Sequence, residues 1–193
     1  MRKVFLLVLL PVFLSCAASN KKLKEDKILS FMVYGDDFLS NIALPNTWHV
    51  DMEYARQNGI NGFFYLRNYN ADNSPAVITL DLAYKSNVNS KLEEWSENNI
   101  NNFLEYYNGF TAEKLNWETV NKNNYKMIVY SLKNDEKDAL QYSAYLDVNL
   151  GYFVNLYITI KDKSRHDEMI NDFKICLENS LFTEIGTEVI DGN

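Results

Sequence analysis

The sequence predicts an α+β domain, in which an antiparallel β-sheet of about seven strands is flanked by two main amphipathic helices. Three observations predict this fold class. Several short segments alternate apolar and polar residues, which is typical of strands with one buried face. Clusters of Gly, Pro, Asn and Asp separate these segments as turns. Finally, only two longer stretches repeat apolar residues at helical spacing.

Strand-like patterns fill most of the first half of the expected domain. The range 77–84 shows the clearest alternation, with Ile78, Leu80 and Leu82 on one face. Pro45 is expected at a strand end, because proline cannot donate a hydrogen bond within a sheet. The expected strands up to this point are 28–34, 38–44, 47–52, 63–67 and 77–84, and two more are expected at 115–120 and 125–133.

The ranges 140–148 and 152–160 are expected to form a hairpin, because a short turn-prone loop joins two regularly alternating segments. Aliphatic residues occupy one face of both strands, as in an antiparallel sheet covered on one side. The opposite face carries Tyr145, Phe153 and Tyr157. Tyrosine offers contact area and a hydrogen bond at low entropic cost, so these three residues form a candidate binding face. The alternative is that tyrosine is simply common in strands and that helices cover this face.

Two helices complete the expected domain. Ser90 and Glu93 match the S-x-x-E capping box, which predicts the start of the first helix, and Gly109 is expected to end it. The second helix is expected over residues 164–180, with Ser164 as its N-cap.

The chain begins with a segment typical of secretory signals. Arg2 and Lys3 are followed by the apolar run 4–14, and then by the small residues Ser15 and Cys16. A membrane-spanning helix needs roughly 20 apolar residues, about twice the length of this run. The segment therefore predicts export rather than a permanent membrane span.

The end of this segment resembles the lipobox of bacterial lipoproteins. The matching residues are Phe13, Leu14, Ser15 and Cys16, although Phe13 stands where the family usually has Leu, Val or Ile. The resemblance implies that Cys16 becomes the N-terminus and carries acyl chains such as palmitate, which anchor the protein in a membrane. Ala17 is not the Asp that marks inner-membrane retention, so the analogy favours the outer membrane. The alternative is an ordinary signal peptide followed by an incidental cysteine.

Composition limits the domain organisation and the partners. The 193 residues carry a net charge of −7, and removing Arg2 and Lys3 from the 19 basic residues leaves 17 against 26 acidic ones, a net of −9. Such an acidic chain is not expected to bind nucleic acid, because that binding depends on Lys and Arg at phosphates. The expected organisation is a signal peptide at 1–15, a lipidated Cys16 with a flexible tether at 16–27, one domain at 28–183 and a tail at 184–193.

No pattern of catalytic or metal-ligating residues is recognisable in the sequence. The only histidines, His49 and His166, are far apart, and no H-E-x-x-H, C-x-x-C or phosphate-binding glycine loop occurs. Cys176 follows the apolar stripe of the second helix and is expected to be a buried structural thiol. We therefore predict no cofactor, no metal site and no catalytic residue.

The order of elements and two segments, 42–50 and 173–182, resemble the PsbP/Mog1-like superfamily. The matching residues are Leu44, Pro45, Trp48, Ser180 and Phe182. The resemblance implies an antiparallel sheet flanked by helices, and a binding or assembly role rather than a defined reaction. These are framework residues, so they transfer no functional site.

Together these observations predict a cell-envelope protein, lipid-anchored through Cys16, whose non-catalytic domain binds or scaffolds another envelope protein. The alternative is a periplasmic or surface protein that binds a small ligand, or an enzyme with a dispersed carboxylate site.

Overall fold

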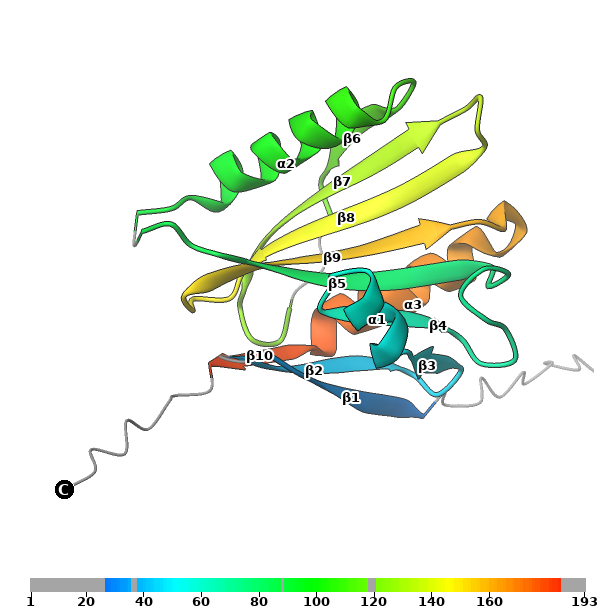
Figure 1. Cartoon of the computed structure of the whole chain (residues 1–193), viewed down its shortest axis with the longest axis horizontal. Helices are drawn as coiled ribbons and strands as arrows, with labels where there is room; N and C mark the ends of the chain where they lie inside the picture. Colours follow the sequence, from blue (N-terminus) through cyan, green and yellow to red (C-terminus); the bar gives the residue numbers. More distant parts are fainter. Residues whose placement is uncertain (1–26, 36–37, 88, 118–120, 185–193) are drawn as a thin grey trace, which may run out of the picture.

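The computed structural model describes residues 27–35, 38–87, 89–117 and 121–184 (Figure 1). Its strands form two antiparallel sheets. The main sheet has the order β3-β4-β5-β9-β8-β7-β6, and the small sheet has the order β1-β2-β10. The main sheet contains β3 (Trp48–Val50), β4 (Gly62–Leu66), β5 (Ala76–Tyr84), β6 (Thr111–Leu115), β7 (Lys126–Asn134), β8 (Ala139–Asp147) and β9 (Tyr152–Ile160). The small sheet contains β1 (Ile28–Tyr34), β2 (Phe38–Pro45) and β10 (Leu181–Glu184).

The helices lie on both faces of the main sheet. They are α1 (Met52–Gln57), α2 (Leu92–Tyr106) and α3 (His166–Asn179), with a short 3-10 turn (Lys163–Arg165) before α3. One face of the main sheet packs against α3 and the small sheet in the largest apolar core. The other face carries α1 over β4 and β5, and α2 over β7, β8 and β9. The predicted α+β class, with its seven-stranded antiparallel sheet and two main helices, is confirmed (Figure 1).

The predicted hairpin forms the centre of the main sheet. Leu146 pairs with Val154 and Ala144 pairs with Leu156 across β8 and β9, and all four side chains are fully buried in the largest core. Because alternation along each strand places these residues on one face, Tyr145 and its neighbours face the opposite side, toward α2.

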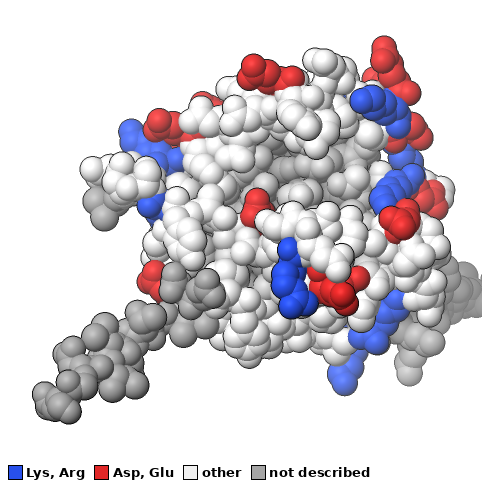
Figure 2. Space-filling model, viewed as in Figure 1, with Lys and Arg blue, Asp and Glu red and all other residues white. Residues whose placement is uncertain are grey.

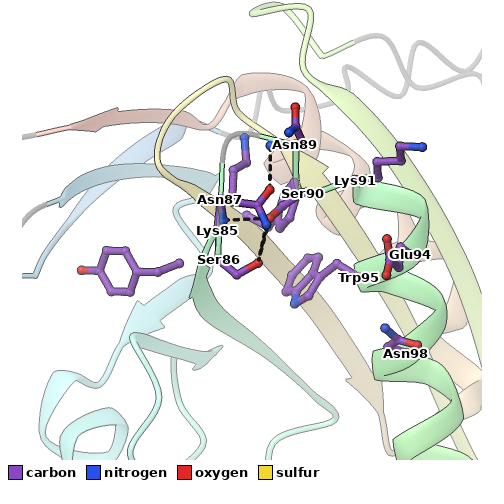
Figure 3. A pocket seen from close by; sticks show the side chains of 11 residues that line it. Lys85, Ser86, Asn87, Asn89, Ser90, Lys91, Glu94, Trp95 and Asn98 are labelled. Atoms are coloured by element: carbon purple, nitrogen blue, oxygen red, sulfur yellow. Dashed lines mark hydrogen bonds between the residues drawn. The ribbon is translucent and has the colours of Figure 1, made fainter.

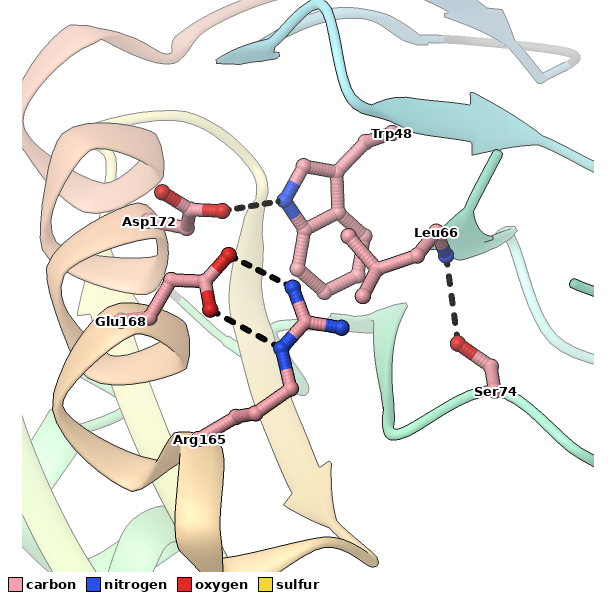
Figure 4. A network of polar contacts seen from close by, with 6 residues as sticks. All are labelled: Trp48, Leu66, Ser74, Arg165, Glu168 and Asp172. Atoms are coloured by element: carbon pink, nitrogen blue, oxygen red, sulfur yellow. Dashed lines mark hydrogen bonds and ion pairs between the residues drawn. The ribbon is translucent and has the colours of Figure 1, made fainter. Parts of the chain in front are cut away.

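A buried polar contact fixes α3 against the edge of the main sheet (Figure 4). Trp48 Nε1 donates a hydrogen bond of 2.8 Å to Asp172 Oδ2, which joins β3 to α3 inside the core. Arg165 donates two hydrogen bonds to Glu168 at the start of α3. Nearby, the Leu66 amide donates to Ser74 Oγ, which closes the loop between β4 and β5. The end of α3 is held to the small sheet in the same way, since Ser180 Oγ accepts from the Ala43 amide at 3.1 Å.

Two of the predicted strands are wrong in their bounds. The range 47–52 is not one strand, because β3 ends at Val50 and α1 follows, with the Asp51 side chain accepting from the Tyr54 amide as N-cap. The strand expected at 115–120 lies earlier, as β6 at Thr111–Leu115, and residues 118–120 are outside the described part of the chain. β6 is polar and largely exposed at the sheet edge, so it lacks the alternation that marks a half-buried strand.

The predicted helix starts are also corrected. Ser90 does not cap α2, which begins at Leu92 after Lys91 with no side-chain cap. The Ser90 hydroxyl instead accepts from the Asn87 amide within the preceding loop. Ser164 does not cap α3 either, because it lies inside the 3-10 turn, which the Asp162 side chain caps. The range 184–193 was expected to be a tail, but Glu184 is the last residue of β10. The sequence did not indicate this strand.

Candidate functional site

A groove lies on the face of the main sheet between α1 and α2. It encloses about 720 Å³, with strands β5, β8 and β9 as its floor and the second half of α2 as its wall. The hollow is visible beneath α2 in Figure 2, where most of the surrounding atoms belong to uncharged residues. The described residues that line it are Asp81, Asn99, Asn102, Phe103, Tyr106, Tyr107, Phe110, Leu132, Gln141, Ser143, Tyr145, Asn155 and Tyr157.

Strand pairing places polar side chains in rows across the floor. Asp81 pairs with Asn155, and Asn155 pairs with Tyr145, so these three residues from β5, β9 and β8 form one row. Directly opposite residues have neighbouring side chains on the same face of a sheet. The next row on this face consists of Thr79, Tyr157 and Ser143. The floor is therefore built of hydroxyl, phenol, amide and carboxyl groups.

The wall of the groove is one face of α2. Its lining residues are Asn99, Asn102, Phe103 and Tyr106. They follow the i, i+3, i+4, i+7 spacing that places side chains on one side of a helix. The Phe103 ring lies 4.7 Å from that of Tyr107 and 5.1 Å from that of Phe110, so an aromatic cluster continues past the end of the helix. Tyr106 projects into solvent at the rim and is 80% exposed.

The groups on the floor are neutral or weakly acidic. Asp81 is the only charged residue among the described residues that line the groove. Partial burial raises the pKa of its carboxyl, although a hydrogen bond from the Leu82 amide opposes this shift. Burial also raises the phenol pKa values of Tyr145 and Tyr157, so both remain protonated hydrogen-bond donors near neutral pH. Asn155 Oδ1 is buried and has no hydrogen-bond partner among the described residues.

A second, smaller hollow lies beside the start of α2 (Figure 3). It encloses about 490 Å³ between the loop after β5 and the first turns of the helix. Its polar groups bond to one another, since the Asn89 amide donates to Asn87 Oδ1 and the Asn87 amide donates to Ser90 Oγ. Lys85 forms an ion pair with Asp147. These internal contacts shape the loop, and we therefore place the candidate site in the larger groove.

Solved structures share this architecture. Cyanobacterial PsbP from Synechocystis sp. PCC 6803 aligns with a TM-score of 0.54 at 11% identity, over 86% of this chain and 99% of that one. The Ran-binding protein Mog1p of Saccharomyces cerevisiae aligns with a TM-score of 0.51 at 13% identity, over 80% of this chain and 95% of that one. The fold is PsbP/Mog1-like. LpqN of Mycobacterium tuberculosis, described as involved in cell envelope biogenesis, aligns with a TM-score of 0.48 at 12% identity, over 84% of this chain and 95% of that one.

No protein-family model matches the sequence. No curated protein matches it either. The likeness to the solved structures nevertheless confirms, at the level of the fold, the PsbP/Mog1-like resemblance stated from the sequence. Its framework residues are all buried, in β2, β3, β10 and at the end of α3, and none of them lines the groove; they are Leu44, Pro45, Trp48, Ser180 and Phe182.

The three residues expected to form a binding face take different positions in this PsbP/Mog1-like fold. Tyr145 and Phe153 are buried beneath α2, where Trp95 stacks on Phe153 at 5.0 Å and meets Tyr145 edge-on at 5.2 Å. Tyr145 and Tyr157 reach the floor of the groove, whereas Phe153 lines the second hollow. Cys16, the expected lipid attachment site, lies outside the described residues.

The histidines and the cysteine of the described chain lie outside the groove. His49 is exposed, and His166 shares hydrogen bonds with the Tyr142 hydroxyl and with Asp167. Cys176 is fully buried, and burial raises the pKa of its thiol to about 12, which confirms the expected structural thiol. Within residues 27–184, as far as the structure describes them, no group of three or more His, Cys, Asp or Glu could hold a metal ion. No helix of the described chain is long and apolar enough to cross a membrane.

Sequence reasoning missed most of the groove. Asp81 and Asn155 are adjacent only because β5 pairs with β9, and nothing in their local sequence indicates this pairing. A signal for the wall was present, because Asn99, Phe103 and Tyr106 repeat at helical spacing directly beside the stripe of Leu92 and Ile100, and Phe103 packs against that stripe. A polar and aromatic stripe beside an apolar one indicates a helix that packs on a sheet and also borders an open site.

Proposed function

We propose that this is an exported, non-catalytic binding protein that is held at the cell envelope by lipid on Cys16 and takes its ligand in the groove beneath α2. The observation that carries the proposal is the groove itself. Sites for small ligands are concave, measure about 300–1,000 Å³ and combine aromatic walls with a few polar groups. The groove, at about 720 Å³, has this size and this lining.

The groove favours a small-ligand-binding protein over an enzyme with a dispersed carboxylate site. Acid–base catalysis by carboxylates uses two groups in different protonation states. Asp81 is the sole carboxylate among the described lining residues, and no His or Cys accompanies it there. The envelope protein partner expected from the sequence stays a prediction, and we assign no surface to it.

The groove can be tested by blocking it. A concentrated small-molecule extract of the host envelope should raise the thermal unfolding midpoint of the full chain by about 2–4 °C, the shift for about 1 kcal/mol of ligand stabilisation. Asn102→Arg, which places a long cation in the groove wall, should abolish the shift. Asn101→Arg is the matched control, because Asn101 is the exposed neighbour in α2 that does not line the groove. Equal shifts in both variants, or none in the wild type, would contradict the proposal.

The anchor is tested separately through Cys16. Cells grown with an alkyne analogue of palmitate should label the wild type, which should fractionate with the outer membrane. Cys16→Ser should lose the label and appear in the soluble exported fraction, because no acyl acceptor remains at the lipobox. Cys176→Ser should keep the label, since Cys176 is buried in the core. An unlabelled wild type would indicate an ordinary signal peptide. A labelled Cys16→Ser protein would show that the acyl chain is attached at another residue, so either result would contradict an anchor on Cys16.

A further inference from the structure

The charge of the groove limits the class of ligand. Among the described residues, no Lys or Arg lines it, although phosphate and carboxylate ligands are normally bound by these side chains. Its floor is made of polar groups such as Asn155, Ser143 and Gln141, which an acyl chain could not satisfy. The lining therefore suits a ligand that is polar and uncharged.

The acceptors on the floor of the groove favour a ligand that carries hydrogen-bond donors. Asn155 Oδ1 is a buried acceptor without a partner among the described residues, and the Asp81 carboxylate lies beside it in the same row. Neighbouring amides and phenols can both donate and accept. A hydroxyl also does both, so a ligand with several hydroxyls could satisfy Asn155 and Asp81 together.

The walls add flat apolar faces to these polar groups. Phe103, Tyr106 and Tyr107 line one side of the groove, and Tyr157 lies on its floor. A pyranose ring has an apolar face of C–H bonds and a rim of hydroxyls, so it can pack on an aromatic ring while its rim forms hydrogen bonds. The groove offers aromatic rings for the apolar face of such a ring and polar side chains for its hydroxyls.

We propose that the ligand of the groove is a neutral oligosaccharide, packed on the aromatic wall of α2 and hydrogen-bonded to Asn155 and Asp81. This inference rests on the proposed function and names its ligand class. A quaternary ammonium ligand would also suit aromatic rings near a carboxylate. The neutral amides of the groove and its volume of about 720 Å³ favour the saccharide over such a compact cation.

The test uses the full chain in a polyoxyethylene detergent, which has no sugar head group, and an array of neutral oligosaccharides followed by calorimetric titration. At least one oligosaccharide should bind. Tyr106→Ala and Asn155→Ala should each weaken binding about tenfold or more, the effect of losing about 1.4 kcal/mol. Tyr106 is 80% exposed, so its replacement should leave folding unchanged.

Two variants serve as matched controls. Asn41→Ala removes a side chain whose Oδ1 is likewise buried without a partner in the described structure, but in the small sheet. Tyr69→Ala removes an exposed tyrosine outside the groove. Both should bind the oligosaccharide within about twofold of the wild type.

Three results would overturn the inference: no neutral oligosaccharide binds, tetramethylammonium binds instead, or binding is indifferent to Tyr106→Ala and Asn155→Ala. The proposed function fails separately. If the envelope extract stabilises the wild type but not Asn102→Arg while the array stays blank, the groove is a binding site and the saccharide class is wrong. If neither the extract nor the array gives a signal, both proposals are wrong.

Discussion

Replacing Trp48 with alanine should lower the free energy of unfolding by about 3–5 kcal/mol, the usual cost of removing a buried Trp. The Trp48 side chain is fully buried where β3 meets α3, and its Nε1 donates to Asp172 Oδ2 at 2.8 Å. The substitution therefore opens a cavity and also removes a donor from a buried carboxylate. Urea denaturation measures this loss. If the slope of the unfolding free energy against urea concentration is unchanged, the variant and the wild type expose the same surface on unfolding, and their free energies can be compared.

Trp48→Phe separates the two contributions. It keeps an aromatic ring in the core but removes the Nε1 donor, so it should cost about 0.5–1.5 kcal/mol, the net contribution of one hydrogen bond. His49→Ala is the control in the same strand, because His49 is exposed and its loss should change stability by less than about 0.5 kcal/mol. If Trp48→Phe were as stable as the wild type, the contact with Asp172 would not stabilise α3.

The parts of the fold that follow from local patterns were predictable from the sequence. The hairpin of β8 and β9 alternates so regularly that its inner face could be assigned residue by residue, and Leu146 and Val154 are buried as expected. Cys176 was predictable for a similar reason, since the apolar stripe of α3 places it against the core. Both cases depend on residues close in sequence, where alternation or helical spacing determines which side is buried.

Short elements were not predictable because they contain too few residues for a periodic pattern. α1 has only 6 residues and one buried side chain, although Asp51 and Glu53 carry the capping and charge signals of a helix start. β10 has 4 residues and is held by backbone pairing to β2. The S-x-x-E match at Ser90 was misleading, because the Asn87 amide uses the same hydroxyl to build the preceding turn.

The groove was beyond sequence reasoning for a different physical reason. Its floor depends on the register between β5 and β9, which brings Asp81 beside Asn155 across a long stretch of intervening chain. A shift of one residue in that register would turn the side chains of one strand to the other face. Alternation identifies the face of each strand, but the partner strand and the register are set by packing of the whole sheet. The sequence could therefore place Tyr157 on one face of the sheet, but it could not place Tyr157 in the groove.

Replacing Trp95 with alanine should loosen α2 on the sheet and open the groove. Trp95 stacks on Phe153 at 5.0 Å and contacts Tyr145 edge-on, so it is the main aromatic contact between the helix and β8 and β9. Lys85 Nζ lies 4.7 Å from the Phe153 ring centroid, so Phe153 has both a ring and a cation as neighbours. Because Trp95 is half-buried, we expect a loss of about 2–3 kcal/mol, below the range for a fully buried Trp.

Trp95→Ala should destabilise α2 more than it destabilises the sheet. Hydrogen exchange should accelerate first at the amides of α2, while the amides of β8 and β9 stay protected, because a single helix on a sheet face can open without unfolding the sheet. Trp95→Phe should retain most of the protection, and Tyr106→Ala should retain all of it, since Tyr106 faces solvent in the same helix. Exchange that accelerates equally in α2 and in the sheet would show that they unfold as one unit. The groove wall would then be as rigid as its floor, and a ligand could gain no selectivity from movement of the helix.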